Sequence, residues 1–66
     1  MIKIQDWELS RLAHLAIVKE GLAAPQIARI RAMERLERLD LDGAHQWSIV
    51  SRRARLILSR MSRALH

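Results

Sequence analysis

Strong helix breakers occur at only two places in this 66-residue chain, which has two glycines and one proline. Gly21 and Pro25 form the first interruption, and the stretch from Asp40 to Gly43 forms the second. Glycine and proline are the residues that most often end helices, so the chain divides into three segments of helical length. The spacing predicts helices over about residues 7–20, 25–39 and 44–63.

The residues between these breakers favour helix throughout. Half of the chain is hydrophobic, chiefly Leu, Ala and Ile, and Phe and Tyr are absent. Ala, Leu, Arg and Glu are strong helix formers, whereas strands are enriched in β-branched and aromatic residues. We therefore predict an all-α fold, a small three-helix bundle that forms one domain over residues 1–66. Apolar residues at helical spacing predict its core: Leu12, Ala16, Ala28, Ala32, Leu36, Trp47, Val50, Ala54 and Leu58.

Local signals place the helix ends. Asp6 is the expected N-cap of the first helix, and Gly21 is expected to end that helix in the left-handed conformation. Pro25 suits the first position of the second helix, and Asp42 or Asp40 can cap the third. Trp47 is the expected anchor of the core, and its replacement by Ala is expected to cost roughly 3–5 kcal/mol.

The size of the chain limits what it can do. A domain of this length buries only about 60% of its unfolded surface, and without cysteine it has no disulfide to add stability. Self-association or a partner can supply what is missing. The longest apolar run, residues 15–18, is far too short to span a membrane, and residues 1–6 show no leader pattern. We expect a cytoplasmic protein that does not use a membrane.

The net positive charge of the chain lies in its last segment. Residues 1–43 contain seven basic and seven acidic side chains, whereas residues 44–66 contain five arginines and no acid. An arginine-rich helix after a short turn matches the outline of a helix-turn-helix, so nucleic-acid binding is one hypothesis. An exposed arginine face that only keeps the domain soluble is the other reading of the same charges. The candidate nucleic-acid-binding residues are Gln46, Arg52, Arg53, Arg55, Arg60 and Arg63.

Our leading hypothesis is a small regulatory or adaptor protein that docks on a larger protein. The first segment is apolar on more than one face, and Ile49 and Leu56 fall among the arginines of the third. Mixed arginine and aliphatic patches are common in protein interfaces. A phage- or plasmid-type modulator of a host complex has this size, and homodimerisation is a simpler variant. The candidate partner-binding residues are Trp7, Ile17, Val18, Ile49, Arg52, Leu56 and Arg60.

No pattern in the chain indicates catalysis, a metal site or a cofactor. The residues Asp40, Asp42 and Gly43 resemble the start of a calcium loop, but the further oxygen ligands of such a loop do not follow. His14 and His45 have no partner at a spacing typical of a catalytic pair. We expect no enzyme activity and no bound cofactor.

The sequence pattern of residues 13–57 resembles that of a family of short, uncharacterised bacterial helical proteins. In this pattern the first helix ends in glycine, the second begins with alanines and contains an Arg-Ala pair, an Asp-Gly turn follows, and the third helix contains a tryptophan. The resemblance implies a compact helical fold and no assigned activity. Here Leu39 stands where a glycine often precedes the aspartate, and the arginines after Trp47 are unusually many. The residues that carry this pattern are Gly21, Ala24, Ala28, Arg31, Ala32, Leu36, Asp40, Gly43, Trp47 and Ile49 or Val50.

Overall fold

The computed structural model describes residues 5–64, and the all-α prediction is confirmed over that range. The elements are α1 (Asp6–Glu20), a short 3₁₀ helix η1 (Gly21–Ala23), α2 (Ala24–Glu37) and α3 (Leu41–Ala64). No strand occurs among these residues. Residues 1–4 and 65–66 of the predicted domain lie outside the described range.

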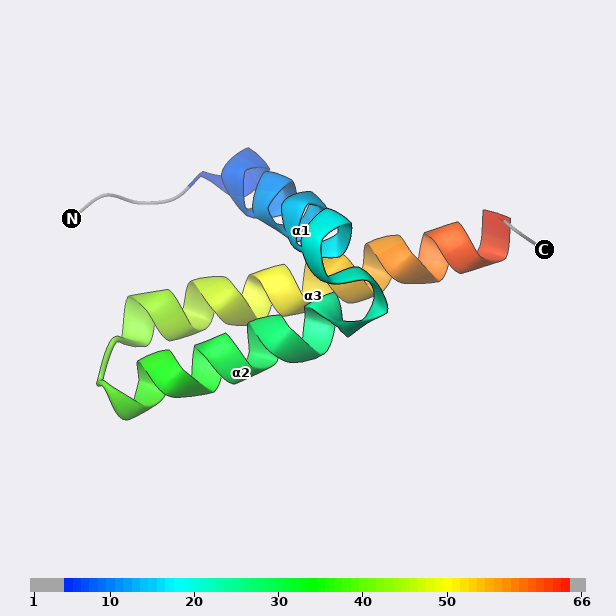
Figure 1. Ribbon diagram of the computed structural model, residues 1–66. Helices are drawn as coiled ribbons and strands as arrows, with labels where there is room; N and C mark the ends of the chain where they lie inside the picture. Colours follow the sequence, from blue (N-terminus) through cyan, green and yellow to red (C-terminus); the bar gives the residue numbers. More distant parts are fainter. Residues whose placement is uncertain (1–4, 65–66) are drawn as a thin grey trace.

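Helices α2 and α3 lie side by side and antiparallel, joined by a tight turn (Figure 1). Helix α1 lies across one side of this pair at a steep angle, and η1 leads from its end directly into α2 (Figure 1). Helix α3 is the longest element, with 24 residues, and its C-terminal turns extend past the other two helices (Figure 1).

Alanine makes up most of the core. Six of the eight buried hydrophobic residues are alanines, and the two larger ones are Leu9 and Val50. Alanine side chains let helix backbones approach closely, and this close approach leaves little room for larger groups. The predicted core members Leu12 and Leu36 are for this reason excluded, with 37% and 54% of their surfaces exposed. The predicted members that are buried are Ala16, Ala28, Ala32, Val50 and Ala54.

Trp47 lies at the edge of this core rather than at its centre. Its ring is half-buried and packs against the alanine cluster from one side. The guanidinium of Arg31 lies 5.0 Å from the ring centroid, within the range of a cation–π interaction. Arg31 also forms an ion pair with Glu20, at 3.6 Å. Trp47 therefore contacts the middle of α2 through Arg31, and Arg31 in turn contacts the end of α1.

A buried hydroxyl links α2 to α3. The Ser51 side chain, on α3, donates a hydrogen bond of 2.7 Å to the backbone carbonyl of Pro25. Ser51 is the buried polar residue of the core, with 7% of its surface exposed. Because the hydroxyl has a partner, its burial carries no desolvation penalty of an unpaired group.

The two ends of α1 differ from each other in how well the sequence predicted them. Gln5 is the N-cap and makes no side-chain cap hydrogen bond, whereas Asp6 is the first helical residue. The prediction of Asp6 as N-cap is therefore wrong, because Asp6 turns toward α3 instead. At the other end Gly21 has φ +61°, as predicted, although its ψ of −135° lies outside the left-handed helical region.

The turn between α2 and α3 is centred on Leu39. We predicted a second helix to residue 39 and a third from residue 44, but α2 ends at Glu37 and α3 begins at Leu41. Leu39 has φ +61°, in the left-handed region. The backbone amide of Asp40 donates a hydrogen bond to the carbonyl of Arg35, and the amide of Leu39 donates one to the carbonyl of Leu36, each at 2.9 Å. This is the Schellman pattern, in which glycine is the usual residue at the position of Leu39.

Asp40 caps α3, in agreement with one of the two predicted caps. Its Oδ1 accepts a hydrogen bond of 3.0 Å from the amide of Gly43, and its Oδ2 lies 3.4 Å from Arg35. Gly43 therefore lies inside the first turn of α3, not in the interhelical turn. A Cβ at Gly43 would lie 2.8 Å from Asp40 Cγ, so glycine leaves the room that the capping carboxylate needs.

Replacing Leu39 with glycine is expected to stabilise the protein by about 0.5–1 kcal/mol. The substitution removes the steric cost of a left-handed leucine, which outweighs the added freedom of glycine in the unfolded chain. Little packing is lost because Leu39 is 83% exposed. Urea denaturation followed by circular dichroism measures the change. Leu41→Gly, two residues later and inside α3, is the control and is expected to destabilise by up to about 1 kcal/mol. A Leu39→Gly protein no more stable than the parent contradicts the assignment.

Candidate interaction surfaces

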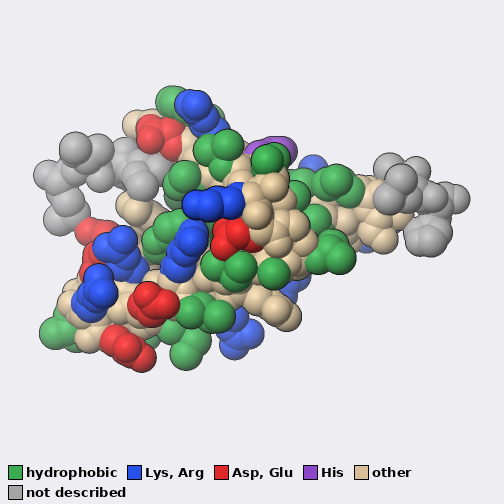
Figure 2. Space-filling view, in the orientation of Figure 1, with side chains coloured by type: hydrophobic (Ala, Val, Ile, Leu, Met, Phe, Trp, Pro, Cys, Tyr) green, Lys and Arg blue, Asp and Glu red, His purple; other side chains and the backbone are tan. Residues whose placement is uncertain are grey.

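The outer face of α1 presents large apolar side chains to solvent. Trp7, Leu15, Val18 and Leu22, the last in η1, are 63%, 53%, 85% and 85% exposed. At 100° per residue Trp7, Leu15 and Val18 fall within about 80° of the circumference of α1, opposite the buried Leu9 and Ala13; Leu22 follows the break at Gly21. We call these four residues the α1 stripe. Hydrophobic side chains stand at the surface over α1 and along α2 (Figure 2).

Two of the predicted partner-binding residues on α1 belong to the α1 stripe and one does not. Trp7 and Val18 are exposed and lie within it. Ile17 is half-buried and packs against the alanine core, so its assignment to an exposed contact surface is wrong. Leu15 was not predicted, although its spacing from Val18 places it on the same helix face. Leu22 was not predicted either, and it lies past the end of α1, in η1.

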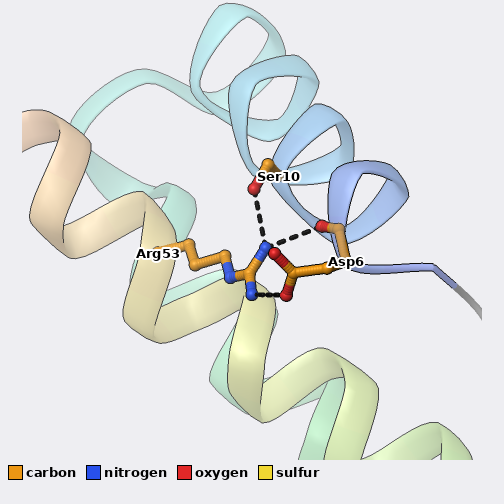
Figure 3. A network of polar contacts seen from close by, with 3 residues as sticks. All are labelled: Asp6, Ser10 and Arg53. Atoms are coloured by element: carbon orange, nitrogen blue, oxygen red, sulfur yellow. Dashed lines mark hydrogen bonds and ion pairs between the residues drawn. The ribbon is translucent and has the colours of Figure 1, made fainter.

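Arg53 fastens the N-terminal end of α1 to α3 (Figure 3). Its Nη1 donates to the backbone carbonyl of Asp6, at 2.7 Å, and to the hydroxyl of Ser10, at 2.6 Å. Its Nη2 forms an ion pair with the carboxylate of Asp6. Only 26% of the Arg53 side chain is exposed. The predicted role of Arg53 in nucleic-acid binding is therefore corrected, because its guanidinium is already occupied.

Leu56 and Arg60 lie on the flank of α3 that faces α1. Together with Asp6, His14 and Arg53 they line a shallow depression of about 270 Å³. Leu56 is 53% exposed, and His14 Nδ1 lies 2.8 Å from the backbone carbonyl of Ser10. This flank contains two of the residues that we predicted for a mixed arginine and aliphatic patch.

Ile49 does not belong to the predicted mixed patch. It is half-buried and packs against the core, which removes it from the exposed arginine face. Arg52, Leu56 and Arg60 are all exposed and follow one another at spacings of four residues, so they are neighbours along α3. The helical wheel places Ile49 near the boundary, and the packing of α1 decides that it faces inward.

The side of α3 away from α1 carries only arginine and serine over four turns. We call this surface, together with Arg29 from α2, the Arg/Ser face. At 100° per residue its α3 members fall within about 100° of the helix circumference. Every member is exposed. Arg29 was not predicted, because nothing in the sequence pattern of α2 relates it to the third segment. The members are Arg29, Ser48, Arg52, Arg55, Ser59, Ser62 and Arg63.

Arg29 and α3 enclose the second depression. Its volume is about 260 Å³, and its lining consists of Arg29, Ser48, Ser51, Arg52 and Arg55, with no acidic side chain. The hydroxyl protons of both serines are already donated, from Ser48 to the carbonyl of Ala44 at 2.9 Å and from Ser51 to that of Pro25. Three guanidinium groups therefore supply the free donors of this depression.

Helices α2 and α3 do not have the arrangement of a helix-turn-helix motif. In that motif the two helices meet at about 90–120°, whereas here they lie side by side and antiparallel (Figure 1). Gln46, which we predicted to reach base edges, is half-buried and lies off the Arg/Ser face. Arg52, Arg55 and Arg63 remain from the predicted set on that face.

Among the described residues, no group of three or more His, Asp or Glu side chains is placed to hold a metal ion. None of the helices in the same range is long and apolar enough to cross a bilayer.

The chain matches no protein-family model, and neither curated proteins nor solved structures give a match. The resemblance of residues 13–57 to short bacterial helical proteins therefore stays a prediction.

Proposed function

We propose that this chain is a small three-helix docking protein, a regulatory or adaptor protein that binds a larger protein through the α1 stripe. The observation that carries the proposal is that α1 is apolar on two opposite faces. Leu9, Ala13 and Ala16 pack inward, while Trp7 and Val18 stand in solvent. Contiguous exposed apolar surface on a small protein marks an interaction site.

The composition of the α1 stripe supports a protein partner. Arg11 and His14 lie on the same side of the helix and are both exposed. Tryptophan and arginine are enriched among the residues that contribute most to protein–protein binding. The part of the stripe on α1, from Trp7 to Val18, is about 17 Å long, a length suited to a groove or to a helix on the partner.

The small core gives a reason for docking. Leu9 and Val50 are the buried hydrophobic residues larger than alanine within the described range, so the chain buries little apolar surface on its own. Association that covers Leu15, Val18 and Leu22 adds the burial that the fold lacks, at about 25 cal/mol per Å² of apolar area.

Recovery of partners from a nuclease-treated lysate tests the proposal when it is done with matched variants. The test variant is Leu15→Glu with Val18→Glu. The control is Ile30→Glu with Met33→Glu, which changes two apolar positions of α2 that are 53% and 57% exposed. We expect one protein at equal molar amount with the parent and the control, and its loss with the test variant. Circular dichroism verifies that each variant is folded.

Two results would overturn the proposal. A partner that the Leu15→Glu, Val18→Glu protein retains does not bind the α1 stripe. Sedimentation that shows a dimer for the parent and a monomer for this variant, with no other protein recovered, assigns the stripe to self-association.

A further inference from the structure

Within residues 5–64, three arginines of this protein form ion pairs, and those of the Arg/Ser face do not. Arg31, Arg35 and Arg53 form ion pairs with Glu20, Asp40 and Asp6, respectively. The arginines of the Arg/Ser face form no ion pair and no side-chain hydrogen bond with any residue that the structure describes. The ion pairs among the described residues therefore lie off the Arg/Ser face, and none of them neutralises its arginines.

Arg29, Arg52 and Arg55 converge on one depression from two helices. The depression of about 260 Å³ lies between α2 and α3 and has no acidic lining residue. Guanidinium groups present a planar fork that matches the oxygens of a phosphate. Because the backbones of α2 and α3 are fixed to each other by the alanine core and by Ser51, the backbone positions of the three arginines are set around the depression before a ligand binds.

The remainder of the Arg/Ser face extends this charge along α3. From Ser48 to Arg63 the face is about 22 Å long. One strand of a B-form duplex carries about six phosphates over this distance, because its nucleotides are spaced about 3.4 Å apart along the axis. A single small anion would occupy only the depression and leave Arg63 unused.

We propose that the Arg/Ser face binds the phosphodiester backbone of a nucleic acid, independently of base sequence. The face contains no hydrophobic side chain between Ser48 and Arg63, whereas the centre of a protein interface is apolar. A helix that lies on a membrane also needs an apolar face to insert, which this side of α3 lacks. Gln46, a side chain suited to reading adenine, lies off the face and half-buried.

Fluorescence anisotropy with a labelled 20-base-pair DNA duplex and an RNA hairpin tests the proposal. The test variant changes Arg29, Arg52 and Arg55 to Gln. The control changes Arg11, Lys19 and Arg38 to Gln, three exposed cations away from the face, so both variants lose three charges from the parent value of +5. We expect the Kd to rise at least tenfold for the test variant and less than threefold for the control. The two probes establish whether DNA, RNA or both supply the backbone.

The salt dependence gives a second readout. Each lost phosphate contact lowers the slope of log K against log salt by about 0.9 for B-DNA, so the test variant is expected to lose 2 to 3 units of slope. An Arg29→Lys, Arg52→Lys, Arg55→Lys protein keeps the charges and is expected to regain most of the slope. Two duplexes of different sequence are expected to bind within about twofold of each other.

Several outcomes overturn the proposal. One is that the parent protein binds neither probe at 50 mM salt. Another is that the test and control variants lose affinity equally, which would show that net charge alone determines binding. Tighter binding to a polyglutamate peptide or to anionic lipid vesicles than to the duplex assigns the face to an acidic protein or a membrane. The Leu15→Glu, Val18→Glu variant is expected to bind nucleic acid normally, so this proposal and that of a protein partner at α1 fail separately.

Discussion

Replacing Ala54 with leucine is expected to destabilise the protein by about 3 kcal/mol, the largest effect of any single substitution considered. Ala54 has no exposed surface and lies in the alanine cluster between the helices. Three additional carbon atoms at this position force the helix backbones apart, and overpacking of this kind costs about 1–3 kcal/mol or more. A domain of this length has a total stability of roughly 3–10 kcal/mol, so much of it is lost.

Thermal unfolding followed by circular dichroism measures this effect. Ser59→Leu is the control, because it adds an apolar side chain to an exposed position of the same helix and is expected to change stability by less than about 0.5 kcal/mol. If the Ala54→Leu protein unfolds cooperatively at the temperature of the parent, the close approach of the helices at this residue is wrong.

Replacing Trp47 with alanine is expected to cost about 2 kcal/mol, less than the sequence alone predicts. A half-buried ring loses only part of the burial of a core tryptophan, and the cation–π contact with Arg31 adds about 0.5–1 kcal/mol. Trp7→Ala is the matched control, since Trp7 is 63% exposed and its removal is expected to cost under about 0.5 kcal/mol. Chemical denaturation of both proteins tests this, and equal losses would contradict the packing of Trp47.

The helix breakers predicted the order of the helical segments but not their ends. Glycine commonly stands in interhelical turns, and the sequence pattern places Gly43 there, yet Gly43 lies inside α3 and makes room for the Asp40 cap. The left-handed position is taken by Leu39, and no property of leucine indicates such a conformation. A turn cannot be predicted from the sequence when its left-handed position holds a residue other than the usual glycine or asparagine.

Hydropathy patterns predicted the buried faces better than the buried residues. Leu12 and Leu36 lie near the core-facing sides of their helices but are left outside by the close approach of the alanines. The charged residues were harder still to predict. Arg53 meets Asp6 across 47 positions of sequence, and Arg29 joins Arg52 only because α2 packs beside α3. Contacts between residues so far apart in sequence depend on helix packing, which a single-helix pattern does not contain.

Because α3 extends beyond α1 and α2, the Arg/Ser face has two parts that differ in rigidity. Arg52 and Arg55 line the depression between α2 and α3, whereas the C-terminal turns of α3, to which Ser62 and Arg63 belong, extend past the other helices (Figure 1). Local opening free energies fall toward zero where few buried contacts hold a segment. The first part is thus preorganised, and the second can adjust its position. In the proposed complex, the nucleic acid contacts a rigid surface at Arg52 and Arg55, and the C-terminal turns adapt to its curvature.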